Sequence, residues 1–138
     1  MTQARIRAAF ETVLNTWAGA QSPAIPVAWQ NITFTPPAGR HVRAYLLPAN
    51  TVSLDLLRVT RTYKGIFQIS LYVPSDNTGM GAAEALIASL DTAFSPSAPL
   101  SSGGLSVWIE EPISVGPAMT EDDQVHIPLS LIYQAHST

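Results

Sequence analysis

The sequence predicts an α+β fold in which a single mixed, mainly antiparallel β-sheet carries two α-helices on one face. Two stretches, residues 2–18 and 79–94, repeat apolar side chains at the 3.6-residue period of a helix. Several others alternate apolar and polar residues, with the period of two that is typical of strands. The resulting order is α–β–β–β–α–β–β–β, and two helices in that order must share one face of the sheet. The 138 residues match the usual size of one domain, so we expect a single domain over residues 1–138.

The first predicted helix covers residues 2–18. Thr2 is a suitable N-cap, and Gly19 follows the last turn. The side chains expected to pack on the sheet form one apolar stripe: Ile6, Phe10, Val13, Leu14 and Trp17. Residues 20–40 are rich in proline and polar residues, which predicts a loop or a short edge strand.

Three strands are predicted next, over residues 41–48, 52–63 and 66–73. The segment Pro48-Ala49-Asn50 fits a hairpin turn between the first two. The third strand alternates clearly, with Phe67, Ile69 and Leu71 on one side. This pattern is typical of a strand that packs on a core through one face.

The second predicted helix, residues 79–94, is followed by a Ser/Pro/Gly-rich loop over residues 95–104. Three further strands are predicted over residues 105–110, 113–115 and 124–134. Because Pro128 has no backbone N–H to donate, we expect the last strand to lie at an edge or to be bulged.

Catalytic motifs are missing from the sequence. There is no cysteine, which excludes disulfides, thiolate metal sites and cysteine nucleophiles. No phosphate-binding glycine loop and no G-x-S-x-G motif occurs. The histidines, His41, His126 and His136, lack the spacing of a zinc site. We therefore expect no catalytic, cofactor or metal site and no enzyme activity. The sequence also contains no run of about 18 apolar residues, the length that a membrane-spanning helix needs.

The charged residues are few and unevenly distributed. They make up 12% of the chain, about half of the roughly 25% that is usual. Interface cores are depleted in charge, so this favours contact with other protein, although a neutral Ser/Thr/Pro-rich surface explains it equally well. Seven basic and two acidic residues give residues 1–64 a net charge of +5, and eight acidic residues give the rest −8. The pI near 5.4 argues against a nucleic-acid surface.

This division of charge predicts which residues meet other subunits. The basic candidates are Arg40, Arg43, Arg58, Arg61 and Lys64. The acidic candidates are Glu110, Glu111, Glu121, Asp122 and Asp123. Trp108 is out of phase with its apolar neighbours, which makes it a candidate contact residue or a residue packed under a helix. Opposite charges could also pair within one subunit, and both readings stay open at this point.

Several segments together resemble a known family. They include Thr16-Trp17-Ala18, Pro26-Val27-Ala28-Trp29-Gln30-Asn31, Phe34-Thr35-Pro36-Pro37, Arg43-Ala44-Tyr45-Leu46-Leu47-Pro48 and Tyr63-Lys64-Gly65-Ile66-Phe67-Gln68-Ile69, followed by Val73-Pro74, Gly79, Gly81 and Phe94. In these segments the chain resembles the tail terminator proteins of long, non-contractile-tailed bacteriophages. That family includes minor tail proteins of the U type and a prophage group described only as a phage-related domain of unknown function.

The resemblance implies a structural role in the virion. Members cap the finished tail tube as a ring, stop its polymerisation and form the surface that joins the head. The implied partners are the chain itself as a homo-hexamer, the major tail tube protein and a head-completion or connector protein, with no nucleic-acid sequence recognition and no membrane. The implied location is the head-proximal end of the tail, after synthesis in the host cytoplasm.

Three alternatives remain open. A head-completion or neck protein and a tail-tube subunit are alternatives within the same class. From a different class, the chain could be a small-ligand-binding or enzymatic α+β domain whose pocket is formed by Trp29 and Phe34.

Overall fold

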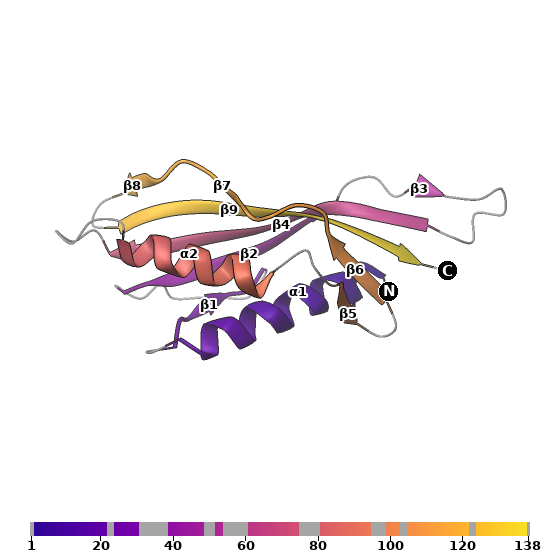
Figure 1. Cartoon of the computed structure of the whole chain (residues 1–138), viewed down its shortest axis with the longest axis horizontal. Helices are drawn as coiled ribbons and strands as arrows, with labels where there is room; N and C mark the ends of the chain where they lie inside the picture. Colours follow the sequence, from indigo (N-terminus) through magenta and orange to yellow (C-terminus); the bar gives the residue numbers. More distant parts are fainter. Residues whose placement is uncertain are drawn as a thin grey trace.

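The computed structural model describes residues 2–21, 24–30, 39–48, 52–53, 61–74, 81–94, 99–102, 105–121 and 124–137. In this part of the chain, two helices and nine strands form (Figure 1). The helices are α1 (Thr2–Gly19) and α2 (Gly81–Ala93). The strands are β1 (Val27–Ala28), β2 (His41–Pro48), β3 (Val52–Ser53), β4 (Arg61–Pro74), β5 (Leu100–Ser102), β6 (Leu105–Ile109), β7 (Ser114–Val115), β8 (Met119–Glu121) and β9 (Gln124–Ser137).

The sheet is mixed and mainly antiparallel, which confirms the predicted fold class. Its strand order is β1-β2-β4-β9-β6-β5, with β3 paired to β4 and with β7 and β8 paired to β9. Among the described strands, β1 and β2 are parallel and the other pairs are antiparallel. The two 14-residue strands β4 and β9 pair along their whole lengths and form the centre of the sheet.

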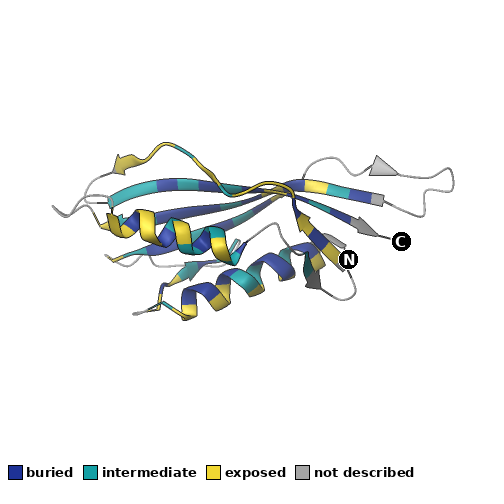
Figure 2. Cartoon of the chain, viewed as in Figure 1, coloured by how far each residue is buried: buried dark blue, intermediate teal, exposed yellow. Residues whose placement is uncertain are grey.

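Both helices lie on the same face of the sheet, as predicted (Figure 1). The buried residues of the helices and strands meet between the two layers (Figure 2). Phe10 of α1 stacks on Phe67 of β4 with ring centroids 4.6 Å apart, and Tyr133 of β9 meets Phe10 edge-on at 5.5 Å. Alternation along β4 directs Phe67, Ile69 and Leu71 into this core, where each is at most 1% exposed.

The opposite face of the sheet carries the alternate residues of the same strands, and among the described residues no helix packs on it (Figure 1). We call it the helix-free face. It includes Tyr45 and Leu47 of β2, Ile66 and Gln68 of β4, Ser130 and Ile132 of β9, and Trp108 of β6.

The predicted strands over residues 52–63 and 66–73 are not separate. Residues 61–74 form one continuous strand, β4, and Val52 and Ser53 form a short strand, β3; residues 54–60 lie outside the described residues. Gly65 lies inside β4, at a point where the neighbouring strands β2 and β9 come so close that a side chain would not fit. A Cβ there would come within 2.6 Å of both the Leu47 carbonyl oxygen and the Tyr133 hydroxyl. The predicted turn residues Ala49 and Asn50 lie outside the described residues.

The last strand is central, so the expectation that Pro128 marks an edge was wrong. β9 lies between β4 on one side and β6, β7 and β8 on the other. The Pro128 carbonyl accepts a hydrogen bond from the Gly116 N–H at 2.8 Å. Because the nitrogen and the carbonyl of one residue point toward the same neighbouring strand, the Pro128 nitrogen, which has no hydrogen to donate, also faces the β7–β8 side. Residues 116–118 interrupt the neighbouring strand there, between β7 and β8. The irregularity that accommodates Pro128 therefore lies in residues 116–118, between β7 and β8, and β9 itself is continuous.

Candidate interaction surfaces

A row of exposed apolar side chains crosses the centre of the helix-free face. Leu47 pairs with Ile66, and Ile66 pairs with Ile132, so the three residues lie side by side on β2, β4 and β9. Their exposed fractions are 45%, 37% and 39%. We call these three residues the apolar row. The outer face of a one-sided antiparallel sheet is normally polar, so this row is an unusual surface.

Trp108 lies beside the apolar row and is 45% exposed, in agreement with the predicted exposure. It pairs with Gln134 of β9, which in turn pairs with Lys64 of β4. The backbone N–H of Glu110 donates to the Ile132 carbonyl at 3.0 Å, so Glu110 extends the apolar row at its far end. The structure therefore brings together three of the predicted interface residues: Lys64, Trp108 and Glu110.

Sequence reasoning missed the apolar row. The available signal was the pair of apolar doublets Ile66-Phe67 and Leu131-Ile132, in which two neighbouring residues are apolar although they face opposite sides. Next to the row, small and polar side chains leave a shallow depression of about 340 Å³. Its lining includes Leu47, Ile66, Gln68, Ser114, Pro128 and Ser130.

A stack of aromatic rings crosses the same face further along the strands. His41, Tyr72 and His126 are register partners on β2, β4 and β9. The ring centroids are 4.6 Å apart between His41 and Tyr72, and 4.5 Å apart between Tyr72 and His126, with nearly parallel planes. The guanidinium of Arg43 lies 5.8 Å from the centre of the Tyr72 ring.

His41 is almost completely buried in this stack, with 1% of its surface exposed. Burial lowers the pKa of its imidazole below the ordinary value, and the positive charge of Arg43 lowers it further. The Gly39 carbonyl, 3.2 Å from Nδ1, opposes this and raises the pKa, but burial is the larger effect. Burial in the stack therefore disfavours the charged form of His41.

The predicted basic residues do not form one cluster. Arg40 precedes β2 and Arg43 lies within it, near the β1 edge of the sheet, whereas Lys64 is exposed on the central strand β4. Arg61 begins β4, and Arg58 lies outside the described residues.

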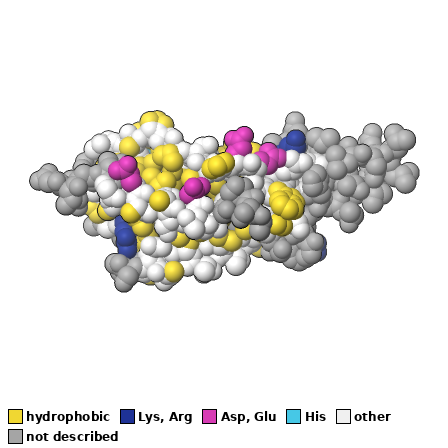
Figure 3. Space-filling model, in the orientation of Figure 1, with side chains coloured by type: hydrophobic (Ala, Val, Ile, Leu, Met, Phe, Trp, Pro, Cys, Tyr) yellow, Lys and Arg dark blue, Asp and Glu magenta, His cyan; other side chains and the backbone are white. Residues whose placement is uncertain are grey.

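The acidic residues lie toward the other edge. Glu110 and Glu111 are exposed just after β6, and Glu121 ends β8; Asp122 and Asp123 lie outside the described residues. On α2, Asp91 accepts a hydrogen bond from the Ile113 N–H at 3.2 Å, which ties the helix to the segment between β6 and β7. Figure 3 shows acidic side chains scattered over the side of the molecule that carries α2. Among the described candidates, Arg40 and Arg43 therefore lie toward the β2 side of the sheet and Glu110 and Glu111 toward the β6 side, whereas Arg61 and Lys64 lie on the central strand β4.

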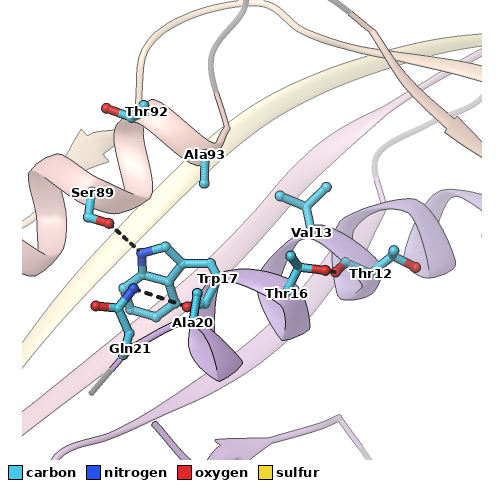
Figure 4. A pocket seen from close by; sticks show the side chains of 9 residues that line it. All are labelled: Thr12, Val13, Thr16, Trp17, Ala20, Gln21, Ser89, Thr92 and Ala93. Carbon is cyan, nitrogen blue, oxygen red and sulfur yellow. Dashed lines mark hydrogen bonds between the residues drawn. The ribbon is translucent and has the colours of Figure 1, made fainter. Parts of the chain in front are cut away.

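On the opposite side of the molecule, a groove of about 580 Å³ lies between α1 and α2 (Figure 4). The Trp17 indole Nε1 donates to the Ser89 hydroxyl at 2.9 Å and joins the two helices across it. Of the described residues, the nine that line the groove are apolar or neutral polar. The groove offers packing surface without a charged group.

A smaller hollow of about 420 Å³ lies between Trp29 and the other side of α1, where Glu11 and Asn15 contribute to its lining. Burial raises the pKa of the Glu11 carboxyl, although Arg7 nearby lowers it. Phe34, the other residue of the predicted ligand pocket, lies outside the described residues. Within the described part of the chain, no group of three or more acidic or histidine residues could hold a metal ion, and no helix is long and apolar enough to cross a membrane.

Comparison with known proteins finds a matching family model and 13 matching chains of solved structures. The model of the family described as "Phage tail terminator protein" matches residues 5–133. One solved structure shares 46% sequence identity with this chain, covers 98% of it and 96% of its own length, and superposes with a TM-score of 0.82. A search of curated proteins gave no match. Because the family model spans nearly the whole chain, the protein belongs to the phage tail terminator family and is a protein of the virion tail.

Proposed function

We propose that the protein caps the finished tail tube as a homo-hexameric ring, stops tube polymerisation and forms the surface that joins the head. Family membership supports a role at the tail tube. The observation that supports a ring is the separation of charge across the sheet. Arg40 and Arg43 belong to the β2 side, and Glu110 and Glu111 belong to the β6 side.

A cyclic ring needs two different patches on each subunit, so that one patch meets the other on the next subunit. Patches of opposite charge at opposite edges meet this requirement and speed the encounter of subunits. On the β2 side, one backbone donor is already satisfied within the chain, because the Gln30 side-chain oxygen accepts a hydrogen bond from the Leu46 N–H at 2.9 Å. The proposed interface includes the remaining candidates as well: Arg58, Arg61, Lys64, Trp108, Glu121, Asp122 and Asp123.

The direct test is growth of tail tubes from purified tail tube protein, with tube length measured by negative-stain electron microscopy. With the protein added, tubes are expected to stop growing and to carry a six-fold ring at one end. Unlimited growth at saturating protein, with no ring bound, would contradict the proposal. In a phage without this gene, overlong headless tails indicate a terminator, headless tails of normal length indicate a neck protein, and a lack of tubes indicates a tube subunit.

The edge contact has its own test. Arg43→Glu and Glu111→Lys should each weaken capping by about tenfold or more, and the double variant should recover most of it. Arg5→Glu is a matched control, because Arg5 is an exposed residue of α1 and lies in the helix layer, outside the sheet. Circular dichroism confirms that each variant is folded. If Arg5→Glu weakens capping as much as Arg43→Glu does, net charge is responsible and the edge contact is wrong.

A further inference from the structure

We propose that two uncharged segments at opposite edges of the sheet form the centre of the contact between neighbouring copies, with residues 112–120 of one copy docked against residues 24–29 of the next. We call residues 112–120 the edge strap and residues 24–29 the β1 edge. The inference rests on the proposed function, which requires two different patches on each copy. It adds the apolar side chains that the charged candidates do not supply.

The edge strap is the outermost segment on one side of β9. It contains β7 and β8, which pair with β9 and with no other described strand. None of its residues is charged, and Val115 and Met119 are 55% and 42% exposed. The hydrogen bond from the Gly116 N–H to the Pro128 carbonyl helps to fix it against β9. The edge strap is therefore an ordered apolar surface, which gains free energy when another protein covers it.

The β1 edge has the same character on the opposite side. β1 is the last strand in that direction, and no described strand pairs with its outer side. Residues 24–29 carry no charge. Pro26 is exposed, and Val27 and Trp29 are partly buried. Figure 1 shows β1 and β8 on opposite sides of the central strands.

Each segment adjoins charges of one sign. Glu110 and Glu111, both exposed, come directly before the edge strap. Arg40 directly precedes β2, and Arg43 of β2 pairs with Ala28 of the β1 edge. An apolar centre with charges at its rim is the usual composition of a protein contact. Contact of either segment with its own copy would bring like charges together, so the segment that fits the edge strap is the β1 edge of the next copy.

The proposed charge contact already reaches the edge strap. Val115 follows Glu111 by four residues, so their backbones lie within about 14 Å of each other. A stable contact buries roughly 800 Å² on each partner, a patch wide enough to include both residues. If Glu111 meets the next copy, the same neighbour therefore covers the edge strap.

The two segments also lie at the same level of the sheet. One line of register partners crosses the strands from His41 through Tyr72 and His126 to Met119. Pro26 is level with His41, because the residues that follow each of them pair with each other. Copies that meet through these edges are therefore not displaced along the strands. A ring whose axis follows the strands closes only without such a displacement.

The first test is cross-linking, for which the chain is suited because it has no cysteine. The double variant Pro26→Cys/Met119→Cys, treated with a short bismaleimide in the presence of tail tubes, should give a ladder of covalent oligomers up to the hexamer. The two positions are about 19 Å apart across one sheet, too far for the reagent within one copy. Each single variant should stay monomeric on a denaturing gel. A dimer from a single variant, or no ladder with or without tubes, would overturn the proposal.

The second test measures tube capping. Met119→Asp should weaken capping by about tenfold or more, because it places a carboxylate in an apolar contact. Adding Pro26→Lys should restore part of the loss, since the two side chains face each other between copies. Thr12→Asp is the matched control, because it adds the same charge to an exposed residue of α1. Circular dichroism confirms that the variants are folded. Equal losses in Thr12→Asp and Met119→Asp would overturn the contact.

The two tests separate this contact from the proposed function. A covalent ladder from a protein that caps no tubes supports the contact and counts only against the proposed function. Normal capping by Met119→Asp, together with no ladder, overturns the contact and leaves the proposed function in place.

Discussion

Gly65 lies where three strands come close together. It pairs with Pro48 of β2 and with Tyr133 of β9, and its Cα faces the Leu47 carbonyl and the Tyr133 ring. The Tyr133 hydroxyl is buried and has no hydrogen-bond partner among the described residues. Burial also raises the pKa of this phenol. The glycine and the tyrosine are therefore one packing unit, in which the ring uses the space that the missing side chain leaves.

The first prediction concerns this unit. Gly65→Ala should lower the free energy of unfolding by about 1–3 kcal/mol, because the new methyl group overlaps a backbone oxygen that cannot move alone. Urea denaturation measures it. Gly81→Ala is the matched control, since a Cβ at Gly81 meets nothing within 4 Å. Equal effects at the two positions would show that the close approach is absent.

The second prediction concerns His41. Its folded pKa lies below the unfolded value of about 6.5, so the folded state binds fewer protons than the unfolded state. Stability should therefore be greatest above pH 6.5 and should fall as the pH drops below it toward the lowered pKa. His41→Phe keeps a ring against Tyr72 and removes the titration, so the slope between pH 8 and 5.5 should become flatter. An unchanged slope in urea unfolding would contradict this role.

At the scale of elements, α1 and α2 are joined by few polar contacts. The Trp17–Ser89 hydrogen bond links the two helices directly. Trp17 is 6% exposed, so its indole N–H has little access to water. Two other hydroxyls of the groove donate within their own helices, Thr16 to the Thr12 carbonyl and Thr92 to the Ala88 carbonyl. One contact therefore carries the polar link between the helices in the described part of the chain.

The third prediction follows from the difference between the Trp17–Ser89 hydrogen bond, which joins the two helices, and the hydroxyl bonds within each helix. Ser89→Ala should cost about 1–2 kcal/mol, because it leaves a buried indole N–H without an acceptor. Thr92→Ala removes a hydroxyl from the same helix and should cost about 0.5 kcal/mol or less. Thermal and urea unfolding of the two variants compare them directly. The link is unimportant if Thr92→Ala proves as costly as Ser89→Ala.

At the scale of the whole molecule, one sheet separates two different surfaces. Ile69 and Ile66 belong to the same strand, yet Ile69 is fully buried and Ile66 is 37% exposed. The helix-side residues hold the fold together, and the helix-free face remains available for contact.

The fourth prediction tests this asymmetry. Ile69→Ala should cost about 2–5 kcal/mol, because it leaves a cavity in the core. Ile66→Ala should cost about 1 kcal/mol or less in the monomer, since much of that side chain already meets water. Urea unfolding at low protein concentration keeps association out of the comparison. Equal losses would mean that the helix-free face is covered within the single chain.

Much of the fold was predictable because it depends on patterns within one element. The stripe that includes Ile6 and Phe10 indicates α1, and the alternation of Phe67, Ile69 and Leu71 indicates the inner side of β4. The continuity of β4 through Gly65 was not predictable, because glycine is a residue type that often marks the end of a strand. The central position of Pro128 was missed for a similar reason. Its missing N–H is matched by an interruption in another strand, which no local pattern reveals.

The candidate site was predictable only in part. The exposure of Trp108 follows from its phase within one strand, and the division of charge follows from counting residues. Two strand pairings, β4 with β9 and β6 with β9, bring Lys64 near Trp108 and Glu110, and both join segments that are far apart in the chain. The separation of Arg43 from Lys64 likewise depends on register, because Arg43 pairs with Ser70, six residues along β4 from Lys64.

The sequence by itself determined which residues face the same side of each helix and strand, because periodicity is a local property of the backbone. It also determined the lack of cysteine chemistry and the +5 and −8 halves. Only the tertiary structure decided which faces lie next to each other. The apolar row and the His41–Tyr72–His126 stack both form across three strands. The register that aligns them comes from burying the opposite face against α1 and α2, a cooperative packing problem to which all these elements contribute.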